Sequence, residues 1–482
     1  MAYIRGNKQD YDNWALSGNN GWDYETVLKY FIKSEDLKNF EGANLGYHGV
    51  GGPLTVDRLN FETPLADAFV KAGNELGYTT VDLAGEHGTG FSKLLSTYRD
   101  GKRCSTAKAF LVPNRNRTNL HISLKSHVTK VHIDAASKTA TGVEFVKDGK
   151  YYSISATKEV ILSAGAIGSP QILMLSGVGP AAELEKHNIP LIQDLEVGKN
   201  LQDHVGVGLS FAINQTVIVP SNTEINDVLD YGAKNESYLT SSMLEASGYM
   251  KTKYADPGLD VPDMQYFLIS TRVFSDINVK KDVYQKVFAP IVNSTIFTIF
   301  LALLRPKSSG EITLNSNNPF DKPLIDPKYY SNAEDIKVMG QGIRLGVQLG
   351  ESNAFAKFGT QFTAYNFPNC ENLQLHSDKF YECYAREMSL SNYHPVGTCK
   401  MGPASDKTAV VDNELRVHGI NKLRVIDGSI MPSIVGGNTN APIIMIGERG
   451  ADLIKNNHRN YYQKKSFLNG INLSKRLSKL IL

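Results

Sequence analysis

The sequence predicts an α/β domain into which a second, α+β domain is inserted. The chain has 482 residues, which is more than one ordinary hydrophobic core accommodates. Short apolar strands, small-residue turns and helices follow one another near residues 160–175 and again after residue 392. Between these parts, residues 206–390 alternate strand-like and helical runs, the pattern of a sheet with helices on one side.

The composition is that of a globular protein, with 41% hydrophobic and 21% charged residues. A net charge of +2 gives no reason to expect a nucleic-acid partner. The cysteines lack the spacing of metal ligands, so no metal site is predicted. They allow at most two disulfides, which leaves the redox compartment open. They are Cys104, Cys370, Cys383 and Cys399.

The first hundred residues predict two helices separated by a glycine-rich loop. Residues 22–35 carry apolar side chains at helical spacing, with Asp23 near the start. The loop H-G-V-G-G-P-L follows at residues 48–54. The second helix covers residues 64–76, with Thr63 as its N-cap and a proline in its first position.

Residues 120–157 predict a meander of three short strands joined by tight turns such as Asp148-Gly149. A fully apolar strand follows at residues 160–162. Ser169-Pro170 then predicts the start of a helix over residues 171–175.

The turn Ala164-Gly165-Ala166 connects this strand to the helix. Its small residues would let a flat or phosphorylated ligand approach the backbone closely. A tight strand-to-helix connection requires small residues as well, so both interpretations stay open.

Residues 177–182, G-V-G-P-A-A, fit the dinucleotide fingerprint G-x-G-x-x-A. The fingerprint must follow a strand, but these residues follow a predicted helix, and the next helical run is short. We therefore reject this match, and with it an NAD-dependent dehydrogenase. No other G-x-G-x-x-G occurs, so the sequence lacks a phosphate-cradling loop of its own.

The inserted domain contains the longest apolar run, residues 287–304, which is short for a bilayer span and rich in β-branched and aromatic residues. We expect a buried strand there and no membrane span. Other strands are expected at residues 207–213, 264–268 and 311–314, and a helix at residues 333–349.

Two segments near the C-terminus carry candidate functional residues. In Y-H-P-V-G-T-C-K-M-G, residues 393–402, His394 precedes a proline, which favours extended geometry and indicates a fixed, presented imidazole. In N-T-N-A-P, residues 438–442, an asparagine cap and a proline predict a helix N-terminus. Its positive dipole end would suit an anionic group, or the asparagines simply cap the helix.

These motifs resemble those of the glucose–methanol–choline (GMC) oxidoreductases, FAD-dependent alcohol and sugar dehydrogenases and oxidases. The chain is most similar to the insect glucose dehydrogenase-like branch. Residues 165–179, G-A-I-G-S-P-Q-I-L-M-L-S-G-V-G, match the second signature of the family. Residues 197–204 (V-G-K-N-L-Q-D-H), 304–310 (L-R-P-K-S-S-G) and 393–402 agree with it too. The resemblance runs from residue 1 to about residue 455.

The resemblance implies an FAD-binding, Rossmann-like domain with an inserted antiparallel-sheet substrate domain. The FAD-binding domain would comprise residues 1–205 and 392–455, and the substrate-binding domain residues 206–391. Residues 456–482 form a polar, basic tail with a weak helical pattern.

The resemblance also implies the chemistry. His394 takes the place of the active-site histidine of the family, and Asn438 that of its partner residue. A neutral imidazole can accept the alcohol proton while the carbinol carbon delivers hydride to flavin N5. An amide at Asn438 can hydrogen-bond the developing alkoxide. We interpret His204 and His418 as structural.

The residues expected to bind FAD are Val128 on the adenine side, and Asp427, Gly428, Asn438 and Thr439 on the flavin side. Ala164 and Gly165 line the same groove, and Gly6 and Asn7 directly follow a flavin-contacting loop. The expected partners are a small alcohol or sugar and an oxygen or quinone-type acceptor. Five N-x-S/T sequons permit an extracellular or secretory location for the full-length parent.

Family members begin with a strand, a G-x-G-x-x-G turn, a helix and an acidic ribose ligand, which would all precede M-A-Y-I-R-G-N here. We therefore expect an incomplete Rossmann-like domain, and a 482-residue chain that does not hold FAD stoichiometrically. Two hypotheses remain: an FAD-dependent oxidoreductase acting on CH–OH groups, or a non-catalytic remnant or interaction protein that does not bind FAD.

Overall fold

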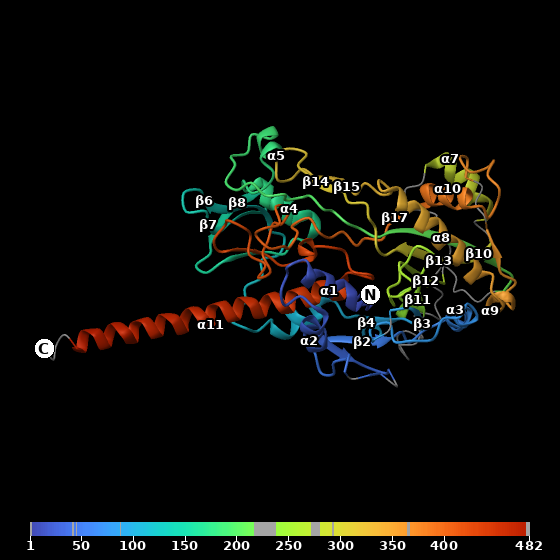
Figure 1. The fold of residues 1–482 in the computed structure, drawn as a ribbon, viewed down its shortest axis with the longest axis horizontal. Coiled ribbons are helices and arrows are strands. Elements are labelled where there is room, and N and C mark those ends of the chain that lie inside the picture. The colour runs from blue at the N-terminus through green and yellow to red at the C-terminus, as the bar shows by residue number, and fades with distance from the viewer. Residues whose placement is uncertain are drawn as a thin grey trace.

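The computed structural model describes residues 2–478 apart from residues 41–42, 45, 87, 216–237, 271–279, 292–293 and 364–366. Figure 1 shows two lobes side by side, with one long C-terminal helix projecting from the first. The mixture of a parallel strand pair and several antiparallel sheets confirms the predicted fold class, α/β plus α+β.

The first lobe contains the parallel pair β9 (Val160–Leu162) and β18 (Leu423–Val425), which joins strands more than 250 residues apart. The predicted meander is confirmed as an antiparallel sheet of β6 (His127–Asp134), β7 (Thr139–Lys147) and β8 (Lys150–Ser155). β6 begins at His127 and not at residue 120, because Leu120, Ile122 and Leu124 are exposed and contribute no strand face. The lobe also holds β14 (Glu311–Thr313) paired with β15 (Leu324–Asp326).

Helix α4 (Gly165–Leu175) starts earlier than the Ser169-Pro170 pair predicts. Pro170 lies inside the helix, where its missing N–H leaves the Ala166 carbonyl without its usual intrahelical partner. The Thr398 hydroxyl donates to that carbonyl at 2.6 Å and takes the place of the lost bond. The rejected dinucleotide match lies between α4 and the short α5 (Ala181–Lys186), so it follows a helix as predicted.

The N-terminal part adds two helices and a small sheet. Asn7 caps α1 (Lys8–Leu16), which the sequence analysis did not predict, and Asp23 caps α2 (Tyr24–Ser34) as predicted. The sheet has the order β1-β2-β4-β5. Its strands are β1 (Glu35–Leu37), β2 (Leu54–Arg58), β4 (Leu95–Arg99) and β5 (Lys102–Arg103).

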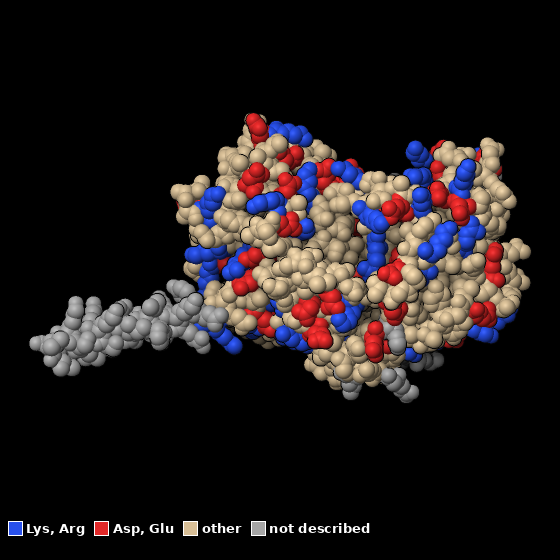
Figure 2. Space-filling view, in the orientation of Figure 1, with Lys and Arg blue, Asp and Glu red and all other residues tan. Residues whose placement is uncertain are grey.

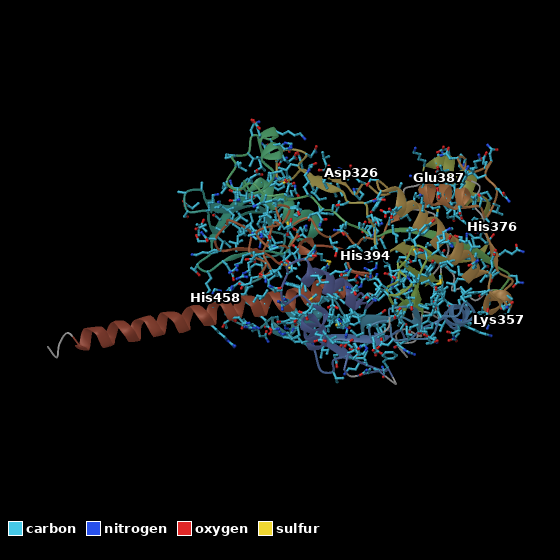
Figure 3. The ribbon with its side chains drawn as sticks, viewed as in Figure 1. Asp326, Lys357, His376, Glu387, His394 and His458 are labelled. Atoms are coloured by element: carbon cyan, nitrogen blue, oxygen red, sulfur yellow. A yellow bond between two sulfur atoms is a disulfide. The ribbon has the colours of Figure 1, made fainter. Side chains whose placement is uncertain are left out.

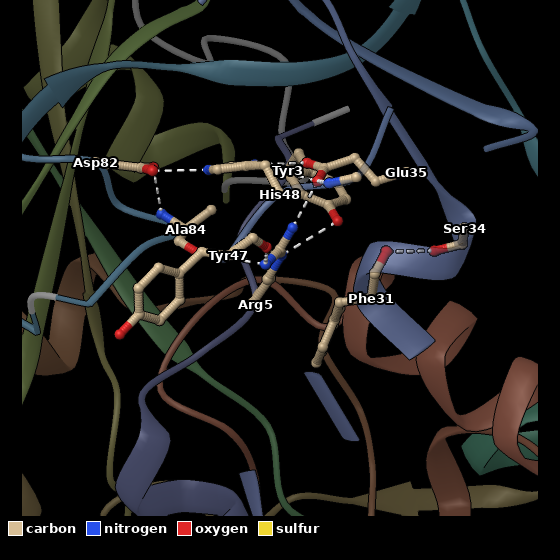
Figure 4. Close-up of polar contacts among 10 residues, drawn as sticks. Tyr3, Arg5, Phe31, Ser34, Glu35, Tyr47, His48, Asp82 and Ala84 are labelled. Atoms are coloured by element: carbon tan, nitrogen blue, oxygen red, sulfur yellow. Dashed lines mark hydrogen bonds and ion pairs between the residues drawn. The ribbon is translucent and has the colours of Figure 1, made fainter. Parts of the chain in front are cut away.

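The glycine-rich loop folds around a buried ion cluster of Arg5, Glu35, His48 and Asp82, which we call the N-terminal ion cluster (Figure 4). Arg5 Nη2 lies 2.8 Å from Glu35 Oε2, and the two His48 ring nitrogens lie 3.0 Å from Glu35 Oε1 and 2.7 Å from Asp82 Oδ2. The backbone N–H of Gly49 donates to Glu35 at 2.7 Å. A Cβ at Gly49 would lie 2.0 Å from the Ile32 carbonyl oxygen, so the loop requires glycine there.

The second lobe is built on a sheet of order β16-β10-β13-β12-β11-β3, with β17 also paired to β10. Its neighbouring pairs are antiparallel. Its strands are β3 (Gly90–Lys93), β10 (Val205–Ile213), β11 (Leu244–Met250), β12 (Met264–Ile269), β13 (Thr295–Leu303), β16 (Gln361–Phe362) and β17 (Leu390–Ser391). Its helices are α3 (Pro64–Glu75), α7 (Lys281–Val283), α8 (Ala333–Gly350), α9 (Asn353–Ala356) and α10 (Asp378–Met388).

Helix α3 and strand β3 precede residue 205 but share the hydrophobic core of the second lobe through Phe69 and Phe91. The division of the chain at residue 205 stays a prediction. Thr63 occupies the N-cap position of α3 as predicted, but its side chain accepts no capping hydrogen bond, and its hydroxyl donates to Glu245 Oε2 at 2.7 Å.

The apolar run 287–304 is only partly a strand. β13 starts at Thr295, and residues 284–291 form short helical turns. The strand itself is buried at the centre of the sheet, as expected. No helix within the described part of the chain is both long and apolar enough to cross a membrane.

Cys370 and Cys383 form a disulfide, and Cys104 and Cys399 are free and buried.

The last helix, α11 (Asn440–Ser478), begins at the predicted asparagine cap and continues through most of the expected tail. In Figure 1 it runs beneath the first lobe and extends well beyond it. On the face drawn in Figure 2, acidic and basic side chains alternate without a large field of one sign, in keeping with the small net charge.

Candidate active site

His394 lies between the two lobes (Figure 3), on the segment that leads from β17 towards β18. Its backbone N–H donates to Asp203 Oδ1 at 2.8 Å. The other oxygen of Asp203 accepts the hydroxyl of Ser391 at 2.5 Å and that of Tyr329. This carboxylate therefore fixes the backbone that carries the histidine, and the residue is buried.

The imidazole of His394 touches a second imidazole. Its Nδ1 lies 2.9 Å from Nδ1 of His204, and the two rings meet edge to face at 5.1 Å between centroids. Nε2 of His204 lies 3.2 Å from the Leu304 carbonyl oxygen. His204 is fully buried. The interpretation of His204 as merely structural is therefore incomplete, because its ring contacts the candidate base.

Asn438 lies on the other side of the His394 ring. Its Nδ2 is 3.2 Å from His394 Nε2, and its Oδ1 accepts from Gln265 Nε2 at 3.4 Å. Gln265 comes from the buried strand β12, so the sheet of the second lobe orients the amide. The structure thus brings together the two residues that the sequence analysis paired, 44 positions apart.

Burial controls the charge of both histidines. It lowers the pKa of His394 to about 4 and, together with the charge of His394, holds the pKa of His204 well below its usual value. Both rings are neutral at pH 7 as a result. A neutral imidazole with a lone pair on one ring nitrogen can accept a proton from a bound hydroxyl group.

A cavity of about 390 Å³ opens beside Asn438, within the usual range for small-molecule sites. Strands β12 and β13 supply Phe267, Ile269 and Phe300 to its wall. The remaining described residues of the lining are Ser242, Met243, Leu244, Leu390, Ser391, Asn392 and Tyr393. None of the described residues of this lining is charged.

A second group of candidate residues meets where β9 and β18 end. Asp427 Oδ2 accepts from the Gly165 N–H at 2.9 Å and from the Ser169 hydroxyl at 2.6 Å. Gly165 has φ +78, and no atom lies within 4 Å of the place where a Cβ would point. Ala164 is exposed next to it. Open space therefore borders this turn.

Hydrogen bonds join this turn to the segment of His394. The Gly397 N–H donates to the Gly428 carbonyl at 3.2 Å, and the Cys399 N–H to the Ser429 carbonyl at 2.8 Å. Gly428 also packs against α11, because a Cβ there would lie 3.1 Å from Ile443 Cδ1. The residues after β18 are therefore bonded to the His394 segment and packed against the first turns of α11.

Gly6 adjoins the loop that leads to Asn438: its missing Cβ would lie 3.1 Å from Val435 Cβ. Asn7 caps α1 through a hydrogen bond from the Gln9 N–H at 2.9 Å. Val128 lies on β6, which packs against α4, the helix that begins at Gly165.

The sequence analysis missed three residues of this site: Asp203, His204 and Gln265. Asp203 and His204 stand in the motif V-G-K-N-L-Q-D-H, which was quoted for its resemblance but given no catalytic role. His418, the other histidine interpreted as structural, contacts the Gly402 carbonyl at 3.0 Å and lies outside the site. A search for further polar residues within the quoted motifs would have found the first two, whereas Gln265 carries no local signal.

Comparisons with known proteins agree on the class. A glucose dehydrogenase [FAD, quinone] of Drosophila pseudoobscura is 41% identical, over 94% of this chain and 72% of the relative. The mitochondrial choline dehydrogenase of mouse is 38% identical, over 94% of this chain and 73% of the relative. The solved structure of a formate oxidase from Aspergillus oryzae RIB40 is similar, with a TM-score of 0.84, 26% identity, and coverage of 95% of this chain and 83% of the other.

The fold, the imidazole–amide pair and these similarities define an oxidoreductase of the flavoprotein class. Sequence models described as GMC oxidoreductase match residues 1–206 and 306–447. The chain belongs to the GMC oxidoreductase family, a family whose cofactor is FAD. This confirms the predicted resemblance.

Proposed function

We propose that this protein is an FAD-dependent oxidoreductase that acts on the CH–OH group of an alcohol or sugar, with His394 as the general base. The observation that carries the proposal is the neutral His394, whose Nε2 lies 3.2 Å from an amide that lines a substrate-sized cavity. An oxygen or quinone-type acceptor would receive the electrons in the end.

His394 Nε2 accepts the hydroxyl proton of the substrate, and the Asn438 amide donates a hydrogen bond to the oxygen as negative charge develops on it. Asp203 holds the backbone of His394 in place while its ring gains the proton. The hydride of the carbinol carbon would need an acceptor, which is the chemistry that bound FAD would supply. The alcohol therefore becomes a carbonyl compound, with one proton on His394 and two electrons removed.

The residues present fit the flavin end of this cofactor. The open space beside Gly165 and the small residues at Ala164 and Gly428 would admit a flat ring. Asp427, Asn438 and Thr439 would contact the flavin, and the N-terminus of α11 would place its positive end there. Gly6, Asn7 and Val128 remain proposed contacts, with Val128 on the adenine side.

The cavity favours a substrate with an apolar body. Phe267, Ile269 and Phe300 form its wall, and two of the polar side chains in the lining already have partners: Ser242 donates to Leu244, and Ser391 to Asp203. A sugar would leave several hydroxyl groups without hydrogen bonds, at a cost of about 1–3 kcal/mol each. We therefore place apolar primary and secondary alcohols before polyols in substrate preference.

Anaerobic reduction of flavin tests the proposal directly. The full-length parent is purified with excess FAD, its flavin absorbance per chain is measured, and bleaching is followed with benzylic or aliphatic alcohols and with glucose. Bleaching by alcohols, faster than by glucose, is expected, whereas the 482-residue chain alone is expected to hold less than one FAD per chain. A parent that stays folded and colourless in excess FAD would instead favour the alternative, a non-catalytic protein that does not bind FAD.

We also propose an extracellular or secretory location. The Cys370–Cys383 disulfide supports it, because stable disulfides are typical of oxidising compartments, and the sequons at Asn116 and Asn214 are exposed. Expression of the full-length parent in insect cells, with glycosidase treatment of the culture medium, tests it. A protein found only in unglycosylated form inside the cells would contradict it.

A further inference from the structure

His204 lies between a backbone carbonyl and the candidate base, and its two ring nitrogens have different partners. Nε2 faces the Leu304 carbonyl oxygen at 3.2 Å, and Nδ1 faces Nδ1 of His394 at 2.9 Å. A carbonyl oxygen has no proton to give, so Nε2 of His204 must carry the hydrogen of that contact. In a neutral imidazole the other nitrogen then has no hydrogen. His204 therefore presents a bare Nδ1 to His394.

The same reasoning about ring hydrogens applies to His394. Two imidazole nitrogens 2.9 Å apart need one hydrogen between them, and only His394 can supply it. Nδ1 of His394 is thus protonated, which leaves the lone pair on Nε2. The Asn438 Nδ2 group, 3.2 Å from that nitrogen, is the donor that a bare Nε2 accepts from. Both neighbours of the His394 ring therefore agree on one tautomer.

The opposite tautomer is disfavoured by burial. If Nδ1 of His394 lacked its hydrogen, His204 would have to donate from Nδ1 and place a bare Nε2 against the Leu304 carbonyl. Two acceptors would then face each other in a site where His204 is fully buried, and leaving buried polar groups unmatched is unfavourable. Asn392 Nδ2 lies 3.4 Å from His394 Nδ1, but rotation of that amide would present its oxygen to the N–H instead.

We propose that His204 is a positioning residue that fixes the tautomer of His394, so that the bare Nε2 faces the substrate and accepts its proton. This rests on the proposed function of His394. In many hydrolases a carboxylate orients the catalytic histidine in this way. Here the neutral imidazole of His204 orients the catalytic histidine. Because His204 carries no negative charge, it does not favour protonation of His394 before the reaction. When His394 gains the proton, its Nδ1–H continues to donate to His204.

Two matched variants separate the two contacts of His204. The side chain of His204→Asn places an amide oxygen near the position of Nδ1 and keeps the acceptor for His394. His204→Gln reaches towards the position of Nε2, keeps a donor for the Leu304 carbonyl and loses the acceptor for His394. His418→Gln is the control, because His418 also contacts a backbone carbonyl but lies outside the site.

The first measurement is independent of activity. Nitrogen-15 NMR of the full chain labelled at histidine distinguishes protonated from bare ring nitrogens, and the signals missing in His394→Ala assign this residue. We expect a protonated Nδ1 and a bare Nε2 on His394 in the wild type, His204→Asn and His418→Gln, and a mixture in His204→Gln. A bare Nδ1 on His394 in the wild type would overturn the proposal, whether or not a variant folds.

The second measurement is the rate of flavin reduction by an alcohol. We expect His204→Gln to lower the rate about 10–100-fold, the usual effect of losing an orienting partner, and His204→Asn to recover about 10-fold of that loss. His418→Gln should match the wild type. Equal rates and equal spectra in His204→Gln and the wild type would remove His204 from the mechanism. A wild type with the expected spectrum but no flavin reduction would instead refute the proposed function alone.

Discussion

His48 and His394 are both buried, yet their surroundings act on them in opposite ways. Burial alone would lower the pKa of His48, but its hydrogen bonds to Asp82 and Glu35 outweigh burial and raise that pKa above its usual value. His394 has no carboxylate on its ring among the described contacts, and burial lowers its pKa to about 4. The N-terminal ion cluster thus favours the charged form of its histidine, whereas the site between the lobes favours the neutral form.

The position of the nearest carboxylate explains the difference. Asp82 binds a ring nitrogen of His48 at 2.7 Å, so it stabilises the imidazolium. Asp203 lies equally close to His394, but it accepts the backbone N–H at 2.8 Å, so it fixes the chain and leaves the ring to another imidazole. A histidine that must accept a proton at neutral pH needs the second arrangement, whereas one that stabilises a fold through ion pairs needs the first.

The largest expected effect is on the reaction. His394→Ala should lower the rate of flavin reduction by an alcohol about 10²–10⁴-fold, because a positioned general base is removed, while flavin absorbance per chain stays at the wild-type level. Stopped-flow spectroscopy measures the rate. The matched change in the other cluster, His48→Ala, should alter stability much more than rate. Reduction at wild-type speed in His394→Ala would exclude this residue as the base.

The next effect is on stability. Glu35→Gln should lower the free energy of unfolding by about 3–5 kcal/mol, because it leaves the buried Arg5 guanidinium without its ionic partner. Denaturant titration measures this change. Asp12→Asn is the control, since it breaks the exposed Lys8–Asp12 pair and should cost less than about 1 kcal/mol. Equal losses in the two variants would show that the buried pair contributes no more to the free energy of unfolding than the exposed pair does.

The two histidines should give opposite pH dependences of stability. The stabilisation from the raised pKa of His48 is fully present below about pH 6.5, the unfolded pKa, and is lost as the pH rises through the higher folded pKa. His394, with a folded pKa of about 4, destabilises the fold as the pH falls below about 6.5.

Unfolding free energies at pH 5 and pH 8 for His48→Gln and His394→Gln test this. Relative to the wild type, the free energy of unfolding of His394→Gln should be about 2 kcal/mol higher at pH 5 than at pH 8. That of His48→Gln, relative to the wild type, should be lower at pH 5 than at pH 8. Parallel pH profiles for the two variants would contradict the assigned charge states.

The smallest expected effect is at the amide. Asn438→Ala removes one hydrogen bond to the developing alkoxide, so the rate of flavin reduction should fall about 3–10-fold, corresponding to about 0.5–1.5 kcal/mol. Stopped-flow rates at saturating alcohol measure the change. Asn317→Ala, which removes an exposed asparagine outside the site, serves as the control. A loss as large as that of His394→Ala would mean that Asn438 takes part in the proton transfer.

Much of the fold could be predicted because its signals are local. The cap at Asp23, the proline in the first turn of α3 and the apolar runs of β9 and β12 lie next to the elements they start or form. The motifs around His394 and Asn438 likewise identified the pair that the structure places 3.2 Å apart. The start of α4 was predicted wrongly because a distant residue matters there: Thr398 donates to the carbonyl that Pro170 leaves without a partner. At the N-cap residue Thr63, likewise, no signal in the sequence indicated that the hydroxyl donates to Glu245.

The sequence by itself determined the family, the fold class and the two residues expected to do the chemistry, because those features depend on residue types within short segments. Only the tertiary structure decided the charge and the tautomer of the histidines. His204 and His394 are 190 residues apart, and Glu35 and Asp82 reach His48 from different elements. A side chain's pKa depends on burial and on the groups within a few ångströms, and folding brings those groups together from distant parts of the chain.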